Sequence, residues 1–242
     1  MNIILALFLL SVVGAFIQRT TGFGFGIFMM TMLPALMPSF GEATALSGLL
    51  SMSMSVVIAY RMRRFITWKR MWGILIAFTI VSTVAIFLLK GIDDHILRQV
   101  LGVALIVLSL YFSLFSSRIK LPTNLVTQMG TGTLSGLMGG FFGMHGAPAA
   151  LYFVSSEPSK EHYMAMCQAY FTIGNVLMSL VRWHEGYFTP LVMVDYLYGI
   201  GGVVLGTVIG RFVYRYISAR LLRYIVYIYI GISGILILIS LK

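Results

Sequence analysis

The chain has 242 residues, of which 59% are hydrophobic and 10% are charged, and its formal net charge at pH 7 is +10. Soluble domains usually contain about 45–50% apolar and about 25% charged residues, so this composition excludes a water-soluble globular fold and makes lipid the expected solvent. The Lys and Arg residues occur in short groups between apolar runs, as in loops that flank membrane spans. This pattern argues against a nucleic-acid-binding protein.

Eight hydrophobic blocks follow one another along the chain. Most have the length of about 20 residues that one membrane-spanning helix needs. The N-terminal run 1–15 has no basic leading region, and apolar sequence resumes soon after it, so we expect a retained first segment rather than a cleaved signal peptide. The blocks cover residues 2–38, 42–60, 71–89, 96–115, 124–156, 163–181, 190–210 and 221–241.

The first and fifth blocks are too long for a single span, and each is interrupted by a cluster of glycines. The first cluster reads GFGFG from Gly22 to Gly26, and the second reads GGFFGMHGAP from Gly139 to Pro148. Gly26 and Gly146 are 120 residues apart, so the order of one broken block and three plain blocks occurs twice.

The distribution of positive charge indicates how the two repeats are oriented. If each broken block enters and leaves on one side, or crosses twice, twelve basic residues share one side and four lie opposite, with Arg19 unassigned. A single crossing would divide them almost evenly, so the positive-inside rule favours the first arrangement, inverted repeats and outward-facing termini. The twelve are Arg61, Arg63, Arg64, Lys69, Arg70, Arg118, Lys120, Lys160, Arg211, Arg215, Arg220 and Arg223. The four are Lys90, Arg98, Arg182 and Lys242.

These patterns predict an all-α polytopic membrane protein that forms a single membrane domain over residues 1–242. The first repeat covers 1–118 and the second 119–242, and each is a glycine-broken helical hairpin followed by three transmembrane helices. Paired interrupted segments in the two halves of a membrane chain are typical of transporter binding sites.

Each break is expected to start a short half-helix, over 27–34 in the first block and 147–153 in the second. The free N–H groups and the positive dipole end of each half-helix would then point into the membrane, where they can bind an anion. Close helix packing is the alternative use of such glycines. The glycines predicted to approach the anion are Gly22, Gly24, Gly26, Gly143 and Gly146.

Several polar side chains near the breaks are candidates for the same site. Arg19 could pair with an anion or extend to a membrane interface, and His145 could donate to an anion or serve a structural role. Gln18, Gln168 and Asn175 could line the path, although hydrogen bonding between helices is the commoner use of buried amides.

Two residues are candidates for proton coupling. Asp195 lies about one turn into the seventh block, and His145 is the histidine within the second glycine cluster. The sequence contains no HExxH motif and no pair of acids deep in the spans, so we expect no metal site and no cofactor.

The sequence resembles the sulfite exporter TauE/SafE family of transporters. The resemblance rests on GFGFG in the first half and on GLMGGFFGMHGAP, residues 136–148, in the second. It implies transport of small anions such as sulfite, sulfonates and sulfur-containing carboxylates across the bacterial cytoplasmic membrane. Phenylalanines in the first motif and His145 in the second stand where many members carry glycine, which leaves the substrate open.

Taken together, these features predict a secondary transporter for a small anionic substrate that works by alternating access within the lipid bilayer. An anion channel with the same site is one alternative, and an intramembrane enzyme, in which His145 would serve a serine, is another. We expect no nucleic-acid partner, and a homo-oligomer is compatible with the sequence.

Overall fold

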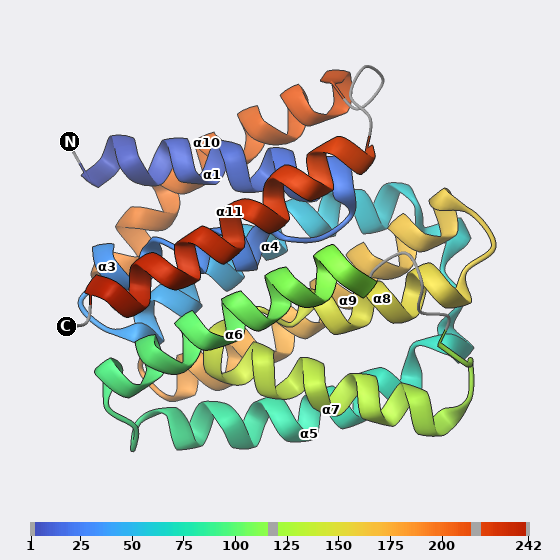
Figure 1. Ribbon diagram of the computed structural model, residues 1–242, viewed down its shortest axis with the longest axis horizontal. Coiled ribbons are helices and arrows are strands. Elements are labelled where there is room, and N and C mark those ends of the chain that lie inside the picture. The colour runs from blue at the N-terminus through green and yellow to red at the C-terminus, as the bar shows by residue number, and fades with distance from the viewer. Residues whose placement is uncertain (1–2, 116–120, 214–218, 241–242) are drawn as a thin grey trace.

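The computed structural model describes residues 3–115, 121–213 and 219–240, and this part of the chain is almost entirely helical (Figure 1). The helices are α1 (Ile3–Thr21), α2 (Phe25–Met30), α3 (Leu33–Leu36), α4 (Phe40–Arg61), α5 (Trp72–Leu89), α6 (Asp94–Phe115), α7 (Leu125–Phe142), α8 (Gly146–Ser156), α9 (Lys160–His184), α10 (Pro190–Val213) and α11 (Ala219–Ser240). Arg118, Lys120, Arg215 and Lys242 lie outside the described residues, as do the side chains of Arg220 and Arg223.

Within the described residues, six helices are long and apolar enough to cross a membrane, namely α1, α4, α5, α6, α9 and α10. This finding confirms the expected all-α polytopic membrane protein. The first helix after each broken block begins in the same way. Ser39 caps α4 by accepting a hydrogen bond from Glu42 N at 3.2 Å, and Ser159, 120 residues later, caps α9 by accepting one from His162 N at 3.3 Å.

Glycines bring α10 against α1, which lie far apart in sequence. A methyl group at Gly202 would collide with the carbonyl oxygen of Phe8, and one at Gly206 would collide with that of Val12. Because both contacts advance by four residues along each helix, α1 and α10 run parallel. Small residues let the two backbones approach closely, as is common between membrane helices.

The same arrangement occurs between α5 and α7. A methyl group at Gly132 would collide with Ile74 O, and one at Gly136 would lie 3.1 Å from Phe78 O, so these helices are also parallel. Each of the two pairs therefore joins a helix from the first half of the chain to one from the second half.

The remaining large contacts join α4 with α9 and α6 with α11, and both of these pairs run antiparallel. In the first pair, Asn175 Nδ2 donates to Ser51 Oγ at 3.3 Å, while Glu42 near the start of α4 accepts from Thr189 just beyond α9. In the second pair, Gly102 lies against Leu238 and Ser109 lies against Gly231, so the contacts advance along α6 as they go back along α11.

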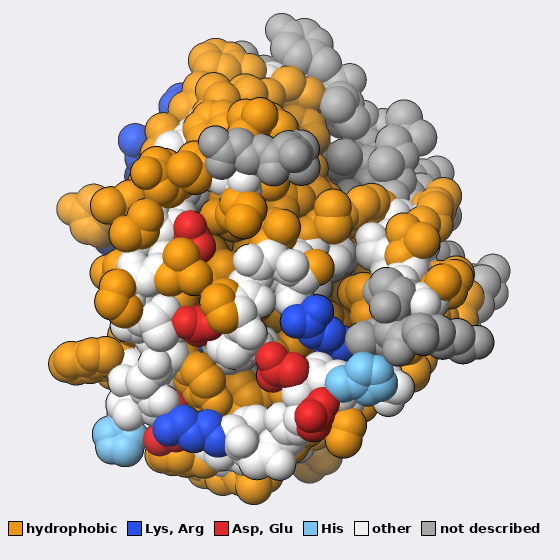
Figure 2. Space-filling model, turned by 90° about the vertical axis from the view of Figure 1, so that its left-hand side faces the viewer, with side chains coloured by type: hydrophobic (Ala, Val, Ile, Leu, Met, Phe, Trp, Pro, Cys, Tyr) orange, Lys and Arg blue, Asp and Glu red, His pale blue; other side chains and the backbone are white. Residues whose placement is uncertain are grey.

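The loops lie at two ends of the helix bundle. One end, which we call the basic end, carries Arg61, Arg63, Arg64, Lys69, Arg70, Lys160 and Arg211 at the termini of α4, α5, α9 and α10. The opposite end, which we call the acidic end, carries Glu42, Asp93, Asp94 and Glu185 together with Lys90, which forms an ion pair with Glu185 at 2.8 Å. Figure 2 looks onto the acidic end and shows acidic, basic and histidine side chains among apolar ones.

Each broken block returns to the end of the bundle from which it starts. The helix α1 runs from the acidic end towards the basic end, and α2 and α3 lead back to the start of α4 (Figure 1). The helix α7 runs in the opposite direction, and α8 leads back to the basic end, where Ser156 O accepts a hydrogen bond from Arg70. The loops after α4 and α8 therefore meet at one end, as the ring contact between Phe65 and His162 also shows.

We expect Gly206→Ala to lower the stability of the protein, because its new methyl group would collide with the backbone of α1. Overpacking of this kind costs about 1–3 kcal/mol. The unfolding temperature in detergent measures the effect. Gly201→Ala is the matched control in α10, because its Cβ would lie 3.5 Å from the Phe8 ring, an ordinary contact. Equal unfolding temperatures for the two variants would contradict the proposed role of Gly206 in packing.

Candidate functional site

The first break depends on two glycines with left-handed backbone conformations. Gly22 has φ 93° and Gly24 has φ 108°, values that L-residues with side chains rarely adopt. Thr21 stabilises the turn by donating to Phe23 O at 2.6 Å, and Tyr163 on α9 donates to Thr21 O at 3.2 Å. Gly24 then occupies the N-cap position of α2, which has no side-chain cap.

The predicted half-helix over 27–34 is wrong in its extent, because the structure divides this segment into α2 and α3. Pro34 has no N–H group to donate to Met30 four residues earlier, and its ring would clash with that carbonyl, so α2 cannot continue through this position. Thr31 adds a side-chain hydrogen bond to Phe28 O at 2.7 Å where α2 ends.

The second break has the geometry of a helix end followed by a new helix. Gly143 ends α7 with φ 66°, and its N–H donates to Gly139 O, while Met144 N donates to Met138 O. The helix α8 begins at Gly146, one residue before the predicted start, and it too has no side-chain cap.

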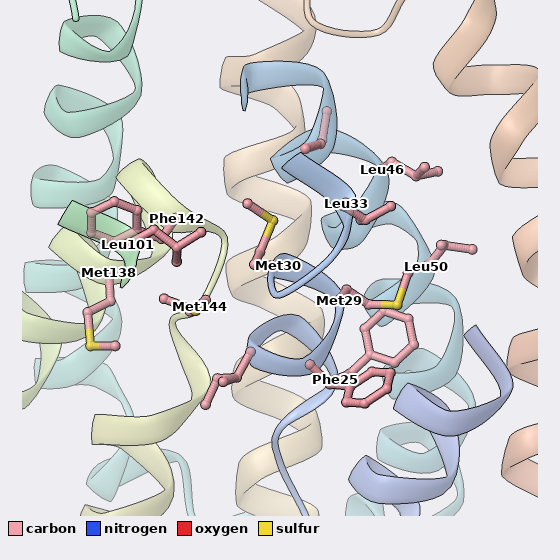
Figure 3. Close-up of a cluster of buried hydrophobic side chains, with 14 of the residues drawn as sticks. Phe25, Met29, Met30, Leu33, Leu46, Leu50, Leu101, Met138, Phe142 and Met144 are labelled. Atoms are coloured by element: carbon pink, nitrogen blue, oxygen red, sulfur yellow. The ribbon is translucent and has the colours of Figure 1, made fainter. Parts of the chain in front are cut away.

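The two breaks meet inside the bundle. A Cβ at Gly26 would lie only 2.6 Å from Gly143 O, so the two backbones are in direct contact. Figure 3 shows the surrounding apolar cluster, in which Met30 of α2 lies on the side of Met144 of the second break, and Met29 lies beside Phe25 and Leu50. The first turns of α2 and α8 are therefore close together, with their N–H groups uncapped by side chains.

A small cavity of ≈ 20 Å³ lies at this meeting point. Six of the predicted site residues line it, namely Gln18, Gly24, Gly26, Gly143, His145 and Gly146. Ile27, Ser51, Met144 and Phe171 complete the lining, and the prediction did not include them. Among the described residues, none that lines this cavity carries a fixed charge.

His145 is the most unusual side chain in this cavity. It is 4% exposed, and neither ring nitrogen has a hydrogen-bond partner among the residues that the structure describes. The rings of Phe78, Tyr170 and Phe171 surround it at centroid distances of 5.4, 5.6 and 5.4 Å. A buried polar group normally has a partner, so an unsatisfied imidazole at the break indicates a place where a ligand or water can bind.

The predicted glutamines hold the first break in place. Gln18 Nε2 donates to Ser55 Oγ and to Gln168 Oε1, both at 3.2 Å, and Gln168 Nε2 donates to Gly22 O at 3.0 Å. This network links α1, α4 and α9. Gln168 does not line the cavity, and Gly22 lies behind it against Tyr163.

Asn175, Arg19 and Asp195 lie outside the cavity lining. Asn175 is 1% exposed and donates to Ser51, which does line the cavity. Arg19 lines a different, larger cavity between α1, α4 and α10. Asp195 is 6% exposed in α10. Their roles in binding or proton coupling remain predictions.

Arg182 is buried near the site, although the sequence predicted that this arginine lies in the loop after the block 163–181. The structure places it inside α9, where it is 1% exposed. Its Nη2 atom donates to Gly139 O at 2.8 Å and to Gly140 O at 3.3 Å, which are carbonyls in the last turn of α7. The guanidinium of Arg182 therefore stabilises the end of α7 just before the second break. Its position near the end of an apolar run gave no sign of this burial.

The sequence matches the family model described as sulfite exporter TauE/SafE over residues 7–237, which is nearly the whole chain. This match includes both breaks and confirms the resemblance that their glycine motifs indicated. No curated protein and no solved structure matches the chain significantly.

Proposed function

We propose that this chain, which belongs to the sulfite exporter TauE/SafE family of membrane transporters, is a secondary transporter of small anions. The family is one of transporters and not of enzymes, and the chain is a multi-pass membrane protein. The proposed substrates are sulfite, sulfonates or sulfur-containing carboxylates, and the proposed location is the bacterial cytoplasmic membrane.

One observation carries the proposal, namely that the two broken segments meet at a shared cavity inside the bundle. Backbone N–H groups at the start of α8 attract negative charge through both hydrogen bonding and the helix dipole. Gln18, Ser51 and His145 add polar groups to the lining. Because the lining holds no fixed cation, such a site would bind a small anion without retaining it too tightly for release.

The size of the cavity supports alternating access. A volume of ≈ 20 Å³ is room for about one water molecule, whereas sulfite has four heavy atoms. An anion can therefore enter only when the contact between Gly26 and Gly143 opens. In our proposal this contact is the closed state of the transport path, and transport alternates its opening towards the two ends.

Inverted repeats are part of the same proposal. Two features support them: α4 and α9, the first helices after each break, run antiparallel, and the broken blocks return to opposite ends of the bundle. The same inversion would relate α1 to α7 and α10 to α5. It would therefore make the parallel pair of α1 with α10 equivalent to the parallel pair of α7 with α5.

Flux measurements in proteoliposomes test the proposal. We expect saturable uptake of one class of anion from a panel of sulfite, sulfonates, small carboxylates and chloride, with competition within the class and counterflow. Flux without saturation or counterflow would favour the anion channel. The absence of flux for every anion would contradict both the transporter and the channel. The glycine breaks would then serve only in helix packing.

We expect His145→Phe to weaken the apparent affinity for the transported anion. Loss of a hydrogen bond to a charged group costs about 1.5–3 kcal/mol, or roughly 10- to 150-fold in affinity. The concentration dependence of flux measures the effect. His162→Phe is the control, because His162 lies at the basic end near Phe65. An unchanged affinity in His145→Phe would remove His145 from the binding site.

The proposed topology predicts which side of the membrane each loop faces. Single cysteines introduced at Arg64 and Lys160, in a Cys167→Ala background, should react with an impermeant thiol reagent from the cytoplasmic side. A cysteine at Gly91, beyond the end of α5, should react from the opposite side. Labelling of the Arg64 and Lys160 positions from different sides would rule out this topology.

A further inference from the structure

A second cavity lies at the basic end of the bundle, between α1, α4 and α10. Its volume is ≈ 500 Å³, within the range of pockets that hold organic ligands. It shares no lining residue with the cavity between the two breaks. We call it the arginine groove, because Arg19, Arg61 and Arg211 all line it.

The three arginines come from three separate helices whose C-terminal turns meet at this end. Arg61 is the last residue of α4, and Arg19 and Arg211 lie in the last turns of α1 and α10. Cations favour helix C-termini in general, which explains each arginine singly. It does not explain why all three face one cavity whose lining, within residues 3–115, 121–213 and 219–240, includes no acidic residue.

Apart from Ser53 and Thr207, whose hydroxyl groups are hydrogen-bonded to Tyr196 and to Val203 O, the rest of the groove is lined by apolar residues and is open towards the bilayer. Val57, Val204 and Val208 line it and are 50%, 59% and 47% exposed. A water-soluble anion would gain nothing from these walls, whereas a hydrocarbon chain would bury apolar area against them.

We propose that the arginine groove binds one anionic phospholipid, with its phosphate among the arginines and an acyl chain along the valines. Guanidinium groups bind phosphate oxygens through paired hydrogen bonds, and basic residues near the membrane surface attract anionic lipids. This proposal does not depend on the transported substrate, and it gives Arg19 a role outside the transport path.

Native mass spectrometry of the full chain in detergent, titrated with phosphatidylglycerol or with phosphatidylcholine of the same acyl chains, tests the proposal. We expect one retained phosphatidylglycerol and no comparable retention of phosphatidylcholine. At about one kcal/mol for each basic residue, the double variant Arg61→Gln/Arg211→Gln should bind phosphatidylglycerol about 30-fold more weakly.

Two further variants separate the groove from general charge effects. The double variant Arg63→Gln/Arg64→Gln makes the same change in net charge in the loop beside the groove, and its lipid affinity should stay within threefold of the wild type. Val204→Trp should weaken lipid binding by filling the groove without changing charge. If the Arg61/Arg211 double variant does not fold, Arg61→Gln alone should still weaken binding about fivefold.

Three results would overturn the proposal. Equal retention of the two lipids would show that the groove does not recognise the anionic headgroup. An equal loss in the Arg63/Arg64 control would show general charge attraction. Displacement of phosphatidylglycerol by millimolar inorganic phosphate would show a site for a soluble anion and not for a lipid.

Discussion

Gly26→Ala is expected to reduce anion flux about 100-fold while leaving a folded membrane protein. Its Cβ would lie 2.6 Å from Gly143 O. Because Gly143 O is a backbone atom, it cannot move away by a change of rotamer as a side-chain atom could. The added methyl group would hold the two breaks apart and prevent the contact that we propose closes the transport path. Overpacking of about 1–3 kcal/mol corresponds to a reduction of about 5- to 150-fold. Flux in proteoliposomes, together with the elution profile in detergent, measures the effect.

Gly130→Ala is the matched control for this prediction. Gly130 lies in α7 on the approach to the second break, and a Cβ there would meet nothing within 4 Å. We expect normal flux from it. Normal flux in Gly26→Ala as well would show that the contact between the two breaks is not part of the transport cycle.

The hydrophobic blocks and both breaks could be predicted from the sequence because they depend on local physical chemistry. A run of about 20 apolar residues specifies a span, and clustered glycines allow the positive φ values found at Gly22, Gly24 and Gly143. An interruption between α2 and α3 was also open to prediction, since Pro34 cannot donate a hydrogen bond to Met30 O and disfavours an unbroken helix through position 34.

The direction in which each side chain points could not be predicted in the same way. Gln18 and Arg19 are neighbours in α1, yet Gln18 lines the cavity at the breaks and Arg19 lines the arginine groove. In a soluble helix an apolar stripe marks the buried face. In α1 apolar residues occur on every side, so the sequence does not indicate which face packs against protein and which faces lipid.

Contacts between helices that are distant in the sequence could not be predicted either. The pairing of α1 with α10 depends on Gly202 and Gly206, and nothing in the sequence around these glycines indicates that α1 is the helix they contact. Arg182 was misplaced for the same reason, because the carbonyls that it binds belong to α7, more than 40 residues earlier in the chain. Each of these features is a property of the packed bundle.

Arg182→Met is expected to destabilise the protein by about 2 kcal/mol. Methionine can fill much of the same space, but it cannot donate to the carbonyl groups of Gly139 and Gly140. An unsatisfied buried carbonyl costs about 1–3 kcal/mol, and Gly139 O keeps one partner, the N–H of Gly143. Loss of the guanidinium also removes a positive charge from the negative end of the α7 dipole. Chemical unfolding in mixed micelles measures the change.

Two other variants show whether the effect comes from the hydrogen bonds of Arg182. Arg182→Lys keeps the positive charge but loses the planar guanidinium group that donates to both carbonyls. Its stability should therefore lie between those of the wild type and Arg182→Met. Arg64→Met removes an exposed arginine at the basic end and should leave stability within about 0.5 kcal/mol of the wild type. Burial of a charge is itself costly, and an apolar replacement of matching shape can compensate for it. If Arg182→Met proves as stable as the wild type, the cost of desolvating the guanidinium cancels the gain from its hydrogen bonds. Flux measurements on the same variant would then test whether Arg182 acts in transport.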